Sequence, residues 1–285
     1  MSTDGNIPFR KMNGLGNDFV VIDGRTRTIA VTEDMVRAAA DRSTGIGCDQ
    51  FILMDKSVFA DLRMRIWNSE GGEVEACGNA SRCVADIVLT ETGADEVSIE
   101  TLGGLLKCTR AGDSLISVDM GEPAFHWSQI PLAEEFYDTT AIELQIGPID
   151  DPILHTPSAV NVGNPHAIFW VEDVEAYELG KIGPLLENHP VFPERANISV
   201  AQVVDPGHVV MKVWERGAGL TRACGTAACA GAVAAARKGL TGRDVRITLP
   251  GGDLQIAWRE SDNRIIMTGP FAYEFEGALP ALQPS

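Results

Sequence analysis

Apolar residues recur along the chain at two spacings, and each spacing predicts a different element. Residues 63–67 (Arg-Met-Arg-Ile-Trp) alternate polar and apolar side chains, and residues 210–214 are a near copy. A period of two predicts a strand with one face buried. Longer apolar stretches at 80–89 and 227–237 predict helices, each followed by a glycine (Gly93 or Gly239) at a position where helices commonly end.

The first fifty-four residues predict three strands, a turn and a helix. Apolar residues at 9–12 and 19–23 flank Asn13-Gly14-Leu15-Gly16-Asn17-Asp18, which has the composition of a turn. Thr32 is a candidate N-cap for a helix over 32–40, because acidic residues follow it in the first turn. The short apolar run at 51–54 predicts a buried strand.

The chain contains an internal repeat. A shift of 147 residues places Ala76-Cys77-Gly78 on Ala223-Cys224-Gly225 and gives seven identities in the seventeen positions 64–80. The same shift places Gly16-Asn17 on Gly163-Asn164, and residues 97–104 match 245–252 at a shift of 148. The repeat predicts two copies of one α/β unit, each with a cysteine at the start of a helix.

Length agrees with two domains, because 285 residues exceed the ~100–200 residues of an ordinary domain. We expect an N-terminal half over residues 1–123 and a C-terminal half over residues 124–269, with the tail at 270–285 packing on the N-terminal half. The acidic, proline-containing segment 124–156 connects the two copies of the repeat. We expect it to add a strand at 141–146.

Charge and cysteine content narrow the class of protein. The 23 basic and 40 acidic residues give a net charge of −17, which argues against nucleic acid and anionic membranes as partners. The N-terminus has no pattern of a secretory signal and no run has the ~18 apolar residues of a membrane span. We therefore expect reduced thiols in the cytoplasm, and neither disulfides nor a zinc site, for the six cysteines: Cys48, Cys77, Cys83, Cys108, Cys224 and Cys229.

The repeated cysteines have the context of acid/base groups. A helix N-terminus lowers the pKa of a thiol, and its free N–H groups can bind a carboxylate. Gly78 and Gly225 let a ligand approach the backbone closely. Two such elements that face each other would hold a carboxylate and place Cys77 and Cys224 on opposite faces of the neighbouring carbon. Removing a proton from one face and returning it to the other inverts that stereocentre.

A simpler interpretation is that Cys77 and Cys224 are small buried residues of a duplicated fold. We give that interpretation to the other four cysteines.

Five motifs together resemble those of the diaminopimelate epimerases, in the same order and over nearly the whole chain. The resemblance implies two similar mixed α/β domains, each a mixed β-sheet curled around a central α-helix, with the active site in the cleft between them. It implies an isomerase without cofactor or metal that interconverts LL- and meso-2,6-diaminopimelate in lysine and peptidoglycan-precursor synthesis. The motifs are 13–19 (Asn-Gly-Leu-Gly-Asn-Asp-Phe), 45–50 (Gly-Ile-Gly-Cys-Asp-Gln), 76–80 (Ala-Cys-Gly-Asn-Ala), 163–166 (Gly-Asn-Pro-His) and 215–226 (Glu-Arg-Gly-Ala-Gly-Leu-Thr-Arg-Ala-Cys-Gly-Thr).

The resemblance also implies roles for single residues. Cys77 and Cys224 match the two acid/base thiols, and His166 and Glu215 match positions that support catalysis. In this correspondence Arg216 suits a carboxylate and Glu215 an ammonium group. The repeat is asymmetric here, with Asn68 opposite Glu215, which fits a substrate held in one direction. The residues that match substrate-binding positions are Asn17, Gln50, Asn68, Gly78, Asn79, Asn164, Asn197, Glu215, Arg216, Gly225 and Thr226.

Alternatives remain open for assembly and activity. Relatives often form a homodimer through a C-terminal tyrosine, which Phe275 replaces here; we expect a homodimer without the hydroxyl contact. Proline racemases and hydroxyproline epimerases are the nearest alternative, because they share paired cysteines. A non-catalytic amino-acid-binding protein and a cysteine hydrolase are the others. Outside the resemblance, Asn17 and Asn164 are ordinary turn residues, His166 is a core histidine, and Glu215-Arg216 is a solvent-facing pair.

Overall fold

The computed structural model of the chain describes residues 6–74 and 77–279. It forms two compact units: unit 1 takes the chain up to Val118 and again from Gly269, and unit 2 takes Asp119–Thr268. Ala76, the first residue of the repeated Ala-Cys-Gly element, and residues 280–285 of the tail lie outside the described residues.

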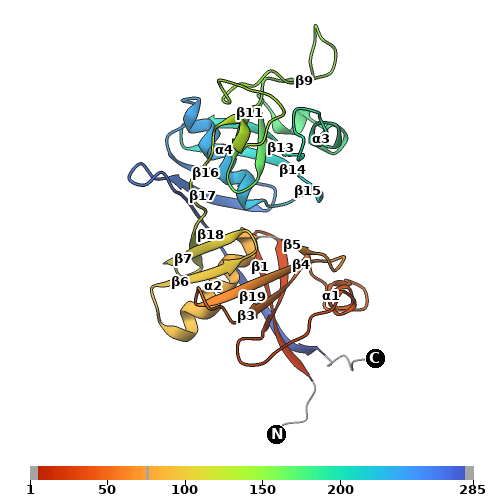
Figure 1. The fold of residues 1–285 in the computed structure, drawn as a ribbon, viewed down its shortest axis with the longest axis vertical. Coiled ribbons are helices and arrows are strands. Elements are labelled where there is room, and N and C mark those ends of the chain that lie inside the picture. Colours follow the sequence, from red (N-terminus) through yellow and green to blue (C-terminus); the bar gives the residue numbers. More distant parts are fainter. Residues whose placement is uncertain (1–5, 75–76, 280–285) are drawn as a thin grey trace. The chain divides into compact units, whose positions relative to one another are not determined.

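The described residues of unit 1 form a mixed sheet together with the helices α1 (Glu33–Ala40) and α2 (Gly78–Thr92) (Figure 1). The pairs β2–β3 and β4–β6 are parallel, whereas β19–β1, β1–β2, β3–β4, β4–β5 and β6–β7 are antiparallel. The elements are β1 (Ile7–Gly14), β2 (Asn17–Asp23), α1 (Glu33–Ala40), β3 (Gln50–Asp55), β4 (Leu62–Asn68), β5 (Glu73–Val74), α2 (Gly78–Thr92), β6 (Glu96–Thr101), β7 (Gly104–Gly112), β8 (Leu115–Asp119), on which the chain leaves the unit, and β19 (Ala272–Leu279).

Unit 2 repeats this scheme. Here β12–β13 and β14–β16 are parallel, whereas β11–β12, β13–β14, β14–β15, β16–β17 and β17–β18 are antiparallel. The elements are η1 (Trp127–Gln129), β9 (Gln145–Ile146), β10 (Leu154–His155), β11 (Ser158–Asn161), β12 (Pro165–Trp170), η2 (Val174–Ala176), α3 (Leu179–Glu187), β13 (Asn197–Asp205), β14 (His208–Glu215), β15 (Gly219–Thr221), α4 (Gly225–Arg237), β16 (Asp244–Leu249), β17 (Gly252–Trp258) and β18 (Ile265–Pro270), on which the chain returns to unit 1.

The strand register repeats together with the sequence. Residue pairs that face each other across two strands of unit 1 reappear in unit 2 at the shift of 147 residues. The shift becomes 148 after the cysteine helix, where Leu62 faces Ile99 and Val209 faces Ile247. The repeat is therefore a repeat of backbone geometry, and its pairs are Phe19–Gln50 and His166–Asn197, Phe51–Trp67 and Ile198–Trp214, Ile66–Val74 and Val213–Thr221.

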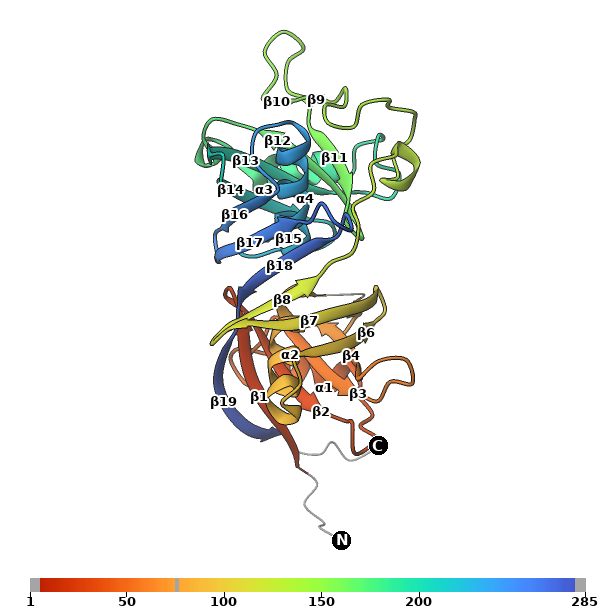
Figure 2. The ribbon, with the colours of Figure 1, turned by 90° about the vertical axis from the view of Figure 1, so that its left-hand side faces the viewer.

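A helix lies at the centre of each unit. Helix α2 packs against β1, β2, β6 and β7, and α4 packs against β11–β14, β16 and β17 (Figure 2). A helix that is apolar on all sides is typical of a buried position, and most of α4 is alanine. Its small residues allow close approach: a Cβ added at Gly231 would lie 2.3 Å from Sδ of Met211.

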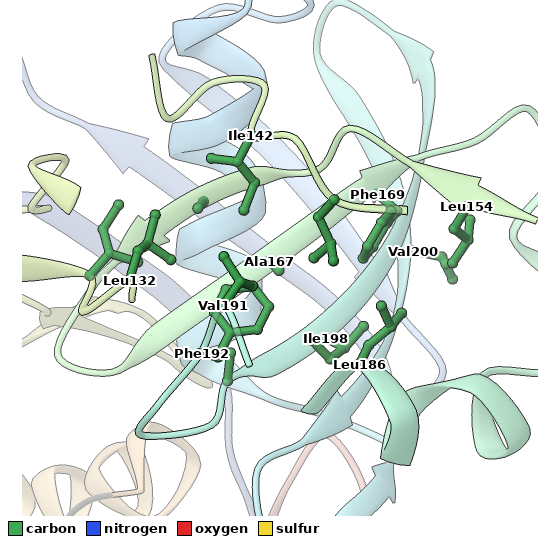
Figure 3. Close-up of a cluster of buried hydrophobic side chains, with 14 of the residues drawn as sticks. Leu132, Ile142, Leu154, Ala167, Phe169, Leu186, Val191, Phe192, Ile198 and Val200 are labelled. Atoms are coloured by element: carbon green, nitrogen blue, oxygen red, sulfur yellow. The ribbon is translucent and has the colours of Figure 1, made fainter. Parts of the chain in front are cut away.

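The connecting segment 124–156 is part of the core of unit 2. Its residues Ile142 and Leu154 pack with Ala167 and Phe169 of β12 and with side chains from β13 and α3 (Figure 3). The predicted strand at 141–146 is wrong for most of its length, because only Gln145–Ile146 pair with another strand. Ile142 and Leu144 are buried, but their N–H groups bind carbonyls of Pro157 and Ile142 outside any ladder.

Other local predictions are confirmed. Thr32 caps α1 by accepting the N–H of Met35, and Gly93 ends α2 with φ of 68°. Strand β3 is buried, and β4 alternates buried and half-buried residues. None of the helices in the described ranges has the length and the apolar run that a membrane crossing requires.

Candidate active site

Cys77 is the N-cap of α2. Its backbone is extended, with φ of −148° and ψ of 105°, and its Sγ accepts the N–H of Ala80 at 3.5 Å. The Cys77 thiol donates to Oδ1 of Asn17 at 3.6 Å. The sulfur therefore lies at the open N–H groups of the helix, where a negative charge is stabilised.

Gln50 and Asn68 are neighbours of this region in unit 1. They face each other across β3 and β4. Oε1 of Gln50 is buried and accepts no hydrogen bond within the part of the chain that the structure describes. Buried polar atoms are rarely left unpaired, so this oxygen is available to a ligand donor. Oδ1 of Asn68 accepts the N–H groups of Glu70 and Gly72 and holds the turn that precedes β5.

Arg82 is a residue of the α2 region that the sequence patterns did not single out. Its side chain is fully buried, and its guanidinium donates to Oδ1 of Asn79 at 2.9 Å. It also donates to the carbonyls of Pro270, at 3.0 Å, and Gly78, at 3.4 Å. A buried cation needs such partners, and these tie the first turn of α2 to the chain that enters β19.

Cys224 is the N-cap of α4 and is only 5% exposed. Its Sγ lies 3.4 Å from Oγ1 of Thr226, and the carboxylate of Glu215 is near enough to affect its pKa. Burial raises the pKa of the Cys224 thiol well above its ordinary value, and the negative charge of Glu215 raises it further. The expectation of a lowered pKa is therefore wrong for Cys224, since desolvation of the thiolate outweighs the helix N–H groups.

Glu215 ends β14 beside this thiol. Burial raises the pKa of its carboxyl group, and hydrogen bonds from Thr221 and Cys224 oppose that rise. Oε1 accepts the hydroxyl of Thr221, which lies on the neighbouring strand β15. Burial therefore raises the pKa of both members of this pair, and the raised pKa of Glu215 makes its carboxylate a stronger proton acceptor than it is in water.

His166 and its partners form the third part of the site in unit 2. Nε2 of His166 lies 2.7 Å from Oδ1 of Asn164, and Nδ1 has no partner among the described residues. Burial lowers the pKa of His166 to about 3, and the charge of Arg216 adds to this effect. The ring is therefore neutral near pH 7 and donates from Nε2. Asn197 faces His166 across β12 and β13.

Arg216 and Asn197 are connected through the backbone. Oδ1 of Asn197 accepts the N–H of Arg216 at 2.9 Å, while Nδ2 donates to the carbonyl of Pro165 at 2.9 Å. The Arg216 guanidinium donates to the carbonyl of Glu194 at 3.1 Å. These bonds fix the Arg216 backbone, and the remaining guanidinium N–H groups suit a carboxylate ligand.

The structure brings the predicted residues together as two sets within their own units. Position by position, the sets are related by the 147-residue shift, including Gln50 and Asn197, a correspondence that the sequence motifs did not reveal. In the described ranges no three His, Cys, Asp or Glu side chains gather as a metal site requires. The corresponding pairs are Asn17 and Asn164, Gln50 and Asn197, Asn68 and Glu215, Cys77 and Cys224, and Asn79 and Thr226.

Solved structures with similar folds share both units. A hydroxyproline epimerase from Agrobacterium vitis superposes with a TM-score of 0.68 at 16% identity, covering 100% of this chain and 95% of that one. A phenazine biosynthesis protein of the PhzF family from Bacillus anthracis gives a TM-score of 0.66 at 18% identity, covering 96% and 99% of the two chains. At such identities these likenesses establish the fold alone.

Sequence relatives are much closer. A diaminopimelate epimerase from Rhodopseudomonas palustris is 56% identical over 286 aligned positions, covering 99% of this chain and 97% of the relative. Another from Bradyrhizobium sp. is 54% identical and covers 99% and 98% of the two chains. The sequence profile of the diaminopimelate epimerases matches residues 9–126 and 158–274. With its duplicated fold and its two cysteine-capped helices, the chain belongs to the diaminopimelate epimerase family.

Proposed function

We propose that this chain is an isomerase that interconverts LL- and meso-2,6-diaminopimelate by proton transfer at Cα, with Cys77 and Cys224 as the two acid/base groups. One observation carries the proposal: in both units the cysteine is the N-cap of the central helix, in the same strand register. A single cysteine at a helix start has many uses, whereas a duplicated one suits a reaction that treats two faces of a carbon alike. The relatives named diaminopimelate epimerase support the substrate.

The proposed reaction balances without a cofactor. The thiolate of one cysteine takes the proton from Cα, and the electron pair moves into the carboxylate as an enolate-like charge. The thiol of the other cysteine then returns a proton to the opposite face, so that Cα is inverted and the two sulfurs exchange protonation states. Helix N–H groups at Gly78-Asn79 and Gly225-Thr226 stabilise the developing charge.

The resting state of unit 2 follows from its electrostatics. Burial and the Glu215 charge raise the pKa of Cys224, so this residue rests as a thiol beside the carboxylate. For Cys224 to act as a base its proton must first pass to a neighbouring acceptor, and Glu215 is the carboxylate next to it. His166, neutral at pH 7, contributes a hydrogen bond and no charge.

The substrate has two amino-acid ends, which the asymmetric residues would distinguish. Glu215 suits an ammonium group and Arg216 a carboxylate, while the corresponding position to Glu215 in unit 1 is the neutral Asn68. We assign substrate binding to these three and to Asn17, Gln50, Asn164 and Asn197. The proposal requires one bound substrate to reach both thiols.

Exchange in deuterated water tests the reaction. We expect LL-diaminopimelate to gain deuterium at Cα as it is inverted, and Cys77→Ala and Cys224→Ala each to lower the rate at least ~10²–10⁴-fold. Cys83→Ala and Cys229→Ala are matched controls, because these buried thiols lie farther along the same two helices. Full activity in both acid/base variants would refute the mechanism. Turnover of proline or hydroxyproline in place of diaminopimelate would favour the related racemases, and binding without exchange would indicate a non-catalytic protein.

We also propose a homodimer that works in the reducing cytoplasm. The support for a dimer is aromatic: Tyr273 and Phe275 of β19 are 51% and 46% exposed, and Phe275 contacts the ring of Phe9 edge-on. The support for the compartment is that none of the six cysteines is in a disulfide. Sedimentation of Phe275→Glu should give monomers if this strand forms the interface; an unchanged mass in wild type and variant would contradict it.

A further inference from the structure

The side-chain amide of Asn17 presents its carbonyl oxygen, and not its NH2 group, to the Cys77 thiol. Oδ1 accepts the thiol proton, and Nδ2 donates to Oδ2 of Asp49 at 3.0 Å. A carbonyl favours the neutral thiol, because only the S–H form can donate to it. An N–H turned toward sulfur would favour the thiolate. The group that fixes the amide of Asn17 therefore decides which form of Cys77 is favoured.

Asp49 is that group, because a carboxylate only accepts hydrogen bonds. Its Oδ2 also takes the backbone N–H of Asp18 at 3.0 Å, and its Oδ1 takes the guanidinium of Arg42 at 2.7 Å. If the amide of Asn17 turned over, two acceptor oxygens would face each other and a charge-assisted hydrogen bond would be lost. Asp49 thus holds Asn17 in one orientation.

A second carboxylate braces Asp49. Oδ1 of Asp18 accepts the backbone N–H of Asp49 at 2.9 Å, and Arg42 and Lys11 bind Asp18 at 2.8 and 2.5 Å. Burial tends to raise the pKa of Asp18, but the hydrogen bonds from Arg42 and Lys11 hold it well below its usual range. Two carboxylates and two cations therefore form a connected network behind Asn17.

Unit 2 has no carboxylate at the position that corresponds to Asp49. The position that corresponds to Asp49 is Ala196. There Oδ1 of Asn164 is bound to Nε2 of His166, and Sγ of Cys224 is bound to Oγ1 of Thr226. The two repeated asparagines thus accept hydrogen bonds from different groups, a thiol in unit 1 and a histidine in unit 2, and the carboxylate of Asp49 belongs to unit 1 alone.

We propose that Asp49 is a positioning residue that, through Asn17, presents a carbonyl acceptor to the Cys77 thiol and so sets the protonation state from which this cysteine starts. Its kinetic consequence rests on the proposed function, but the hydrogen bonding can be measured without substrate. The hydrogen bonds of the duplicated site thereby differ between the halves before any ligand binds.

Alkylation of Cys77 by iodoacetamide at pH 7, followed on its peptide by mass spectrometry, tests the proposal. In Asp49→Asn the neutral amide can pair with Asn17 in either orientation, so an N–H reaches the sulfur for part of the time. We expect alkylation of Cys77 to become about three- to tenfold faster, the equivalent of one hydrogen bond, and kcat to fall by a similar factor. Unchanged or slower alkylation would overturn the proposal. If Asp49→Asn does not fold, Asp49→Ala, which copies Ala196, carries the same expectation.

Two further variants separate positioning from general support. Arg42→Gln removes the cation that Asp18 and Asp49 share but keeps the bond between Asp49 and Asn17, so the alkylation rate and kcat should stay within about twofold. In an Asn17→Leu background, Asp49→Asn should change alkylation no further. An equal change with and without the Asn17 amide would mean that Asp49 acts by another route. A wild-type chain that does not epimerise diaminopimelate would refute the proposed function and leave the alkylation result standing.

Discussion

The indole N–H of Trp214 donates to Oε2 of Glu187 at 2.7 Å. Oε1 of the same carboxylate accepts the N–H of Gly217 at 2.9 Å and the guanidinium of Arg195 at 3.2 Å. Glu187 is only 5% exposed, so these three donors bind a buried carboxylate. Two of them flank Glu215-Arg216, and Glu187 thereby anchors the end of β14 and the turn that follows it.

Glu187→Gln should destabilise unit 2 and impair the site together. The amide oxygen can replace only one acceptor, and its NH2 faces a donor, so at least one hydrogen bond to a charged group is lost. We expect the free energy of unfolding to fall by about 2–3 kcal/mol, measured by urea denaturation, and kcat/KM for diaminopimelate to fall at least about tenfold because Glu215 and Arg216 shift.

Glu175→Gln is the matched control for this change. The side chain of Glu175 is 74% exposed and pairs with Lys212 at 2.5 Å. Exposed pairs contribute only ~0.2–1 kcal/mol, so this variant should stay close to wild type. Equal losses from the two substitutions would mean that burial of Glu187 has no special role.

Gly183 lets Trp214 reach the backbone of α3. A Cβ at Gly183 would lie 2.5 Å from Cγ and 2.7 Å from Cδ2 of the rigid indole ring, whereas a Cβ at Gly180 would meet only Cδ1 of Leu220 at 3.1 Å. Gly183→Ala should therefore lower stability by about 1–3 kcal/mol. Gly180→Ala, on the same helix, should be neutral or stabilising by up to ~1 kcal/mol, because alanine favours helix. Thermal unfolding of the two variants distinguishes these outcomes, and similar Tm values would contradict the close approach.

Helix α3 itself illustrates where sequence reasoning ends. Its nine residues include Gly180, Gly183 and Pro184, which oppose helix formation, so no local pattern predicts it. Packing against Trp214 and the side-chain bonds of Glu187 stabilise it instead. In contrast, the cysteine helices and β4 were predictable, because caps and hydrophobic periods are local signals. The strand predicted at 141–146 failed because Ile142 and Leu144 are buried without a pairing partner.

The residues of the candidate site also fall into two groups, those that local sequence patterns identify and those that only the folded structure reveals. The repeat and the motifs identified Cys77, Cys224 and Glu215, because these residues are part of a local pattern. The direction of the Cys224 pKa was not predictable, since it depends on burial by residues far away in sequence. Asp49 and Arg82 act on the site through contacts that only the folded units create.

We expect the ionised carboxylate of Glu215 to lower the free energy of unfolding at neutral pH. Burial raises its pKa, so the folded state binds the proton more tightly than the unfolded chain, whose value is near 4.5. The tighter proton binding by Glu215 stabilises the folded state below pH 4.5, and this stabilisation is lost as pH rises through the raised pKa. Glu215→Gln should therefore be more stable than wild type at pH 8, with the difference closing toward pH 4, while epimerase activity falls ~10²–10⁴-fold.

The exposed Glu260 provides the control for Glu215. Its side chain is 85% exposed and lies 3.8 Å from Arg243, so Glu260→Gln should follow wild type at both pH values and keep its activity. Urea titrations at pH 4 and pH 8 give the comparison. A wild type that is as stable as Glu215→Gln at pH 8 would indicate a carboxylate that is well solvated in the folded state.

His166 should make the stability of unit 2 depend on pH in the opposite sense. Burial, aided by the charge of Arg216, lowers its pKa from 6.5 to about 3. The folded state keeps the ring neutral while the unfolded chain takes up a proton. The stability that the neutral ring of His166 allows is therefore fully present above pH 6.5. As pH falls from 6.5 toward 3, the free energy of unfolding decreases by about 1.4 kcal/mol per pH unit.

His166→Gln tests this dependence, because the amide can still donate to Asn164 but does not titrate. Carboxylates also titrate in this range, so the difference between the two proteins is the quantity to measure. The decline in unfolding free energy between pH 6 and pH 4 should be shallower in the variant by about 1.4 kcal/mol per pH unit. His126→Gln, at an exposed histidine whose side chain forms hydrogen bonds only with Ser128 among the described residues, should keep the wild-type slope. Parallel curves for wild type and His166→Gln would mean that the buried ring accepts a proton in the folded state, and that Nδ1 has a proton acceptor or solvent near it.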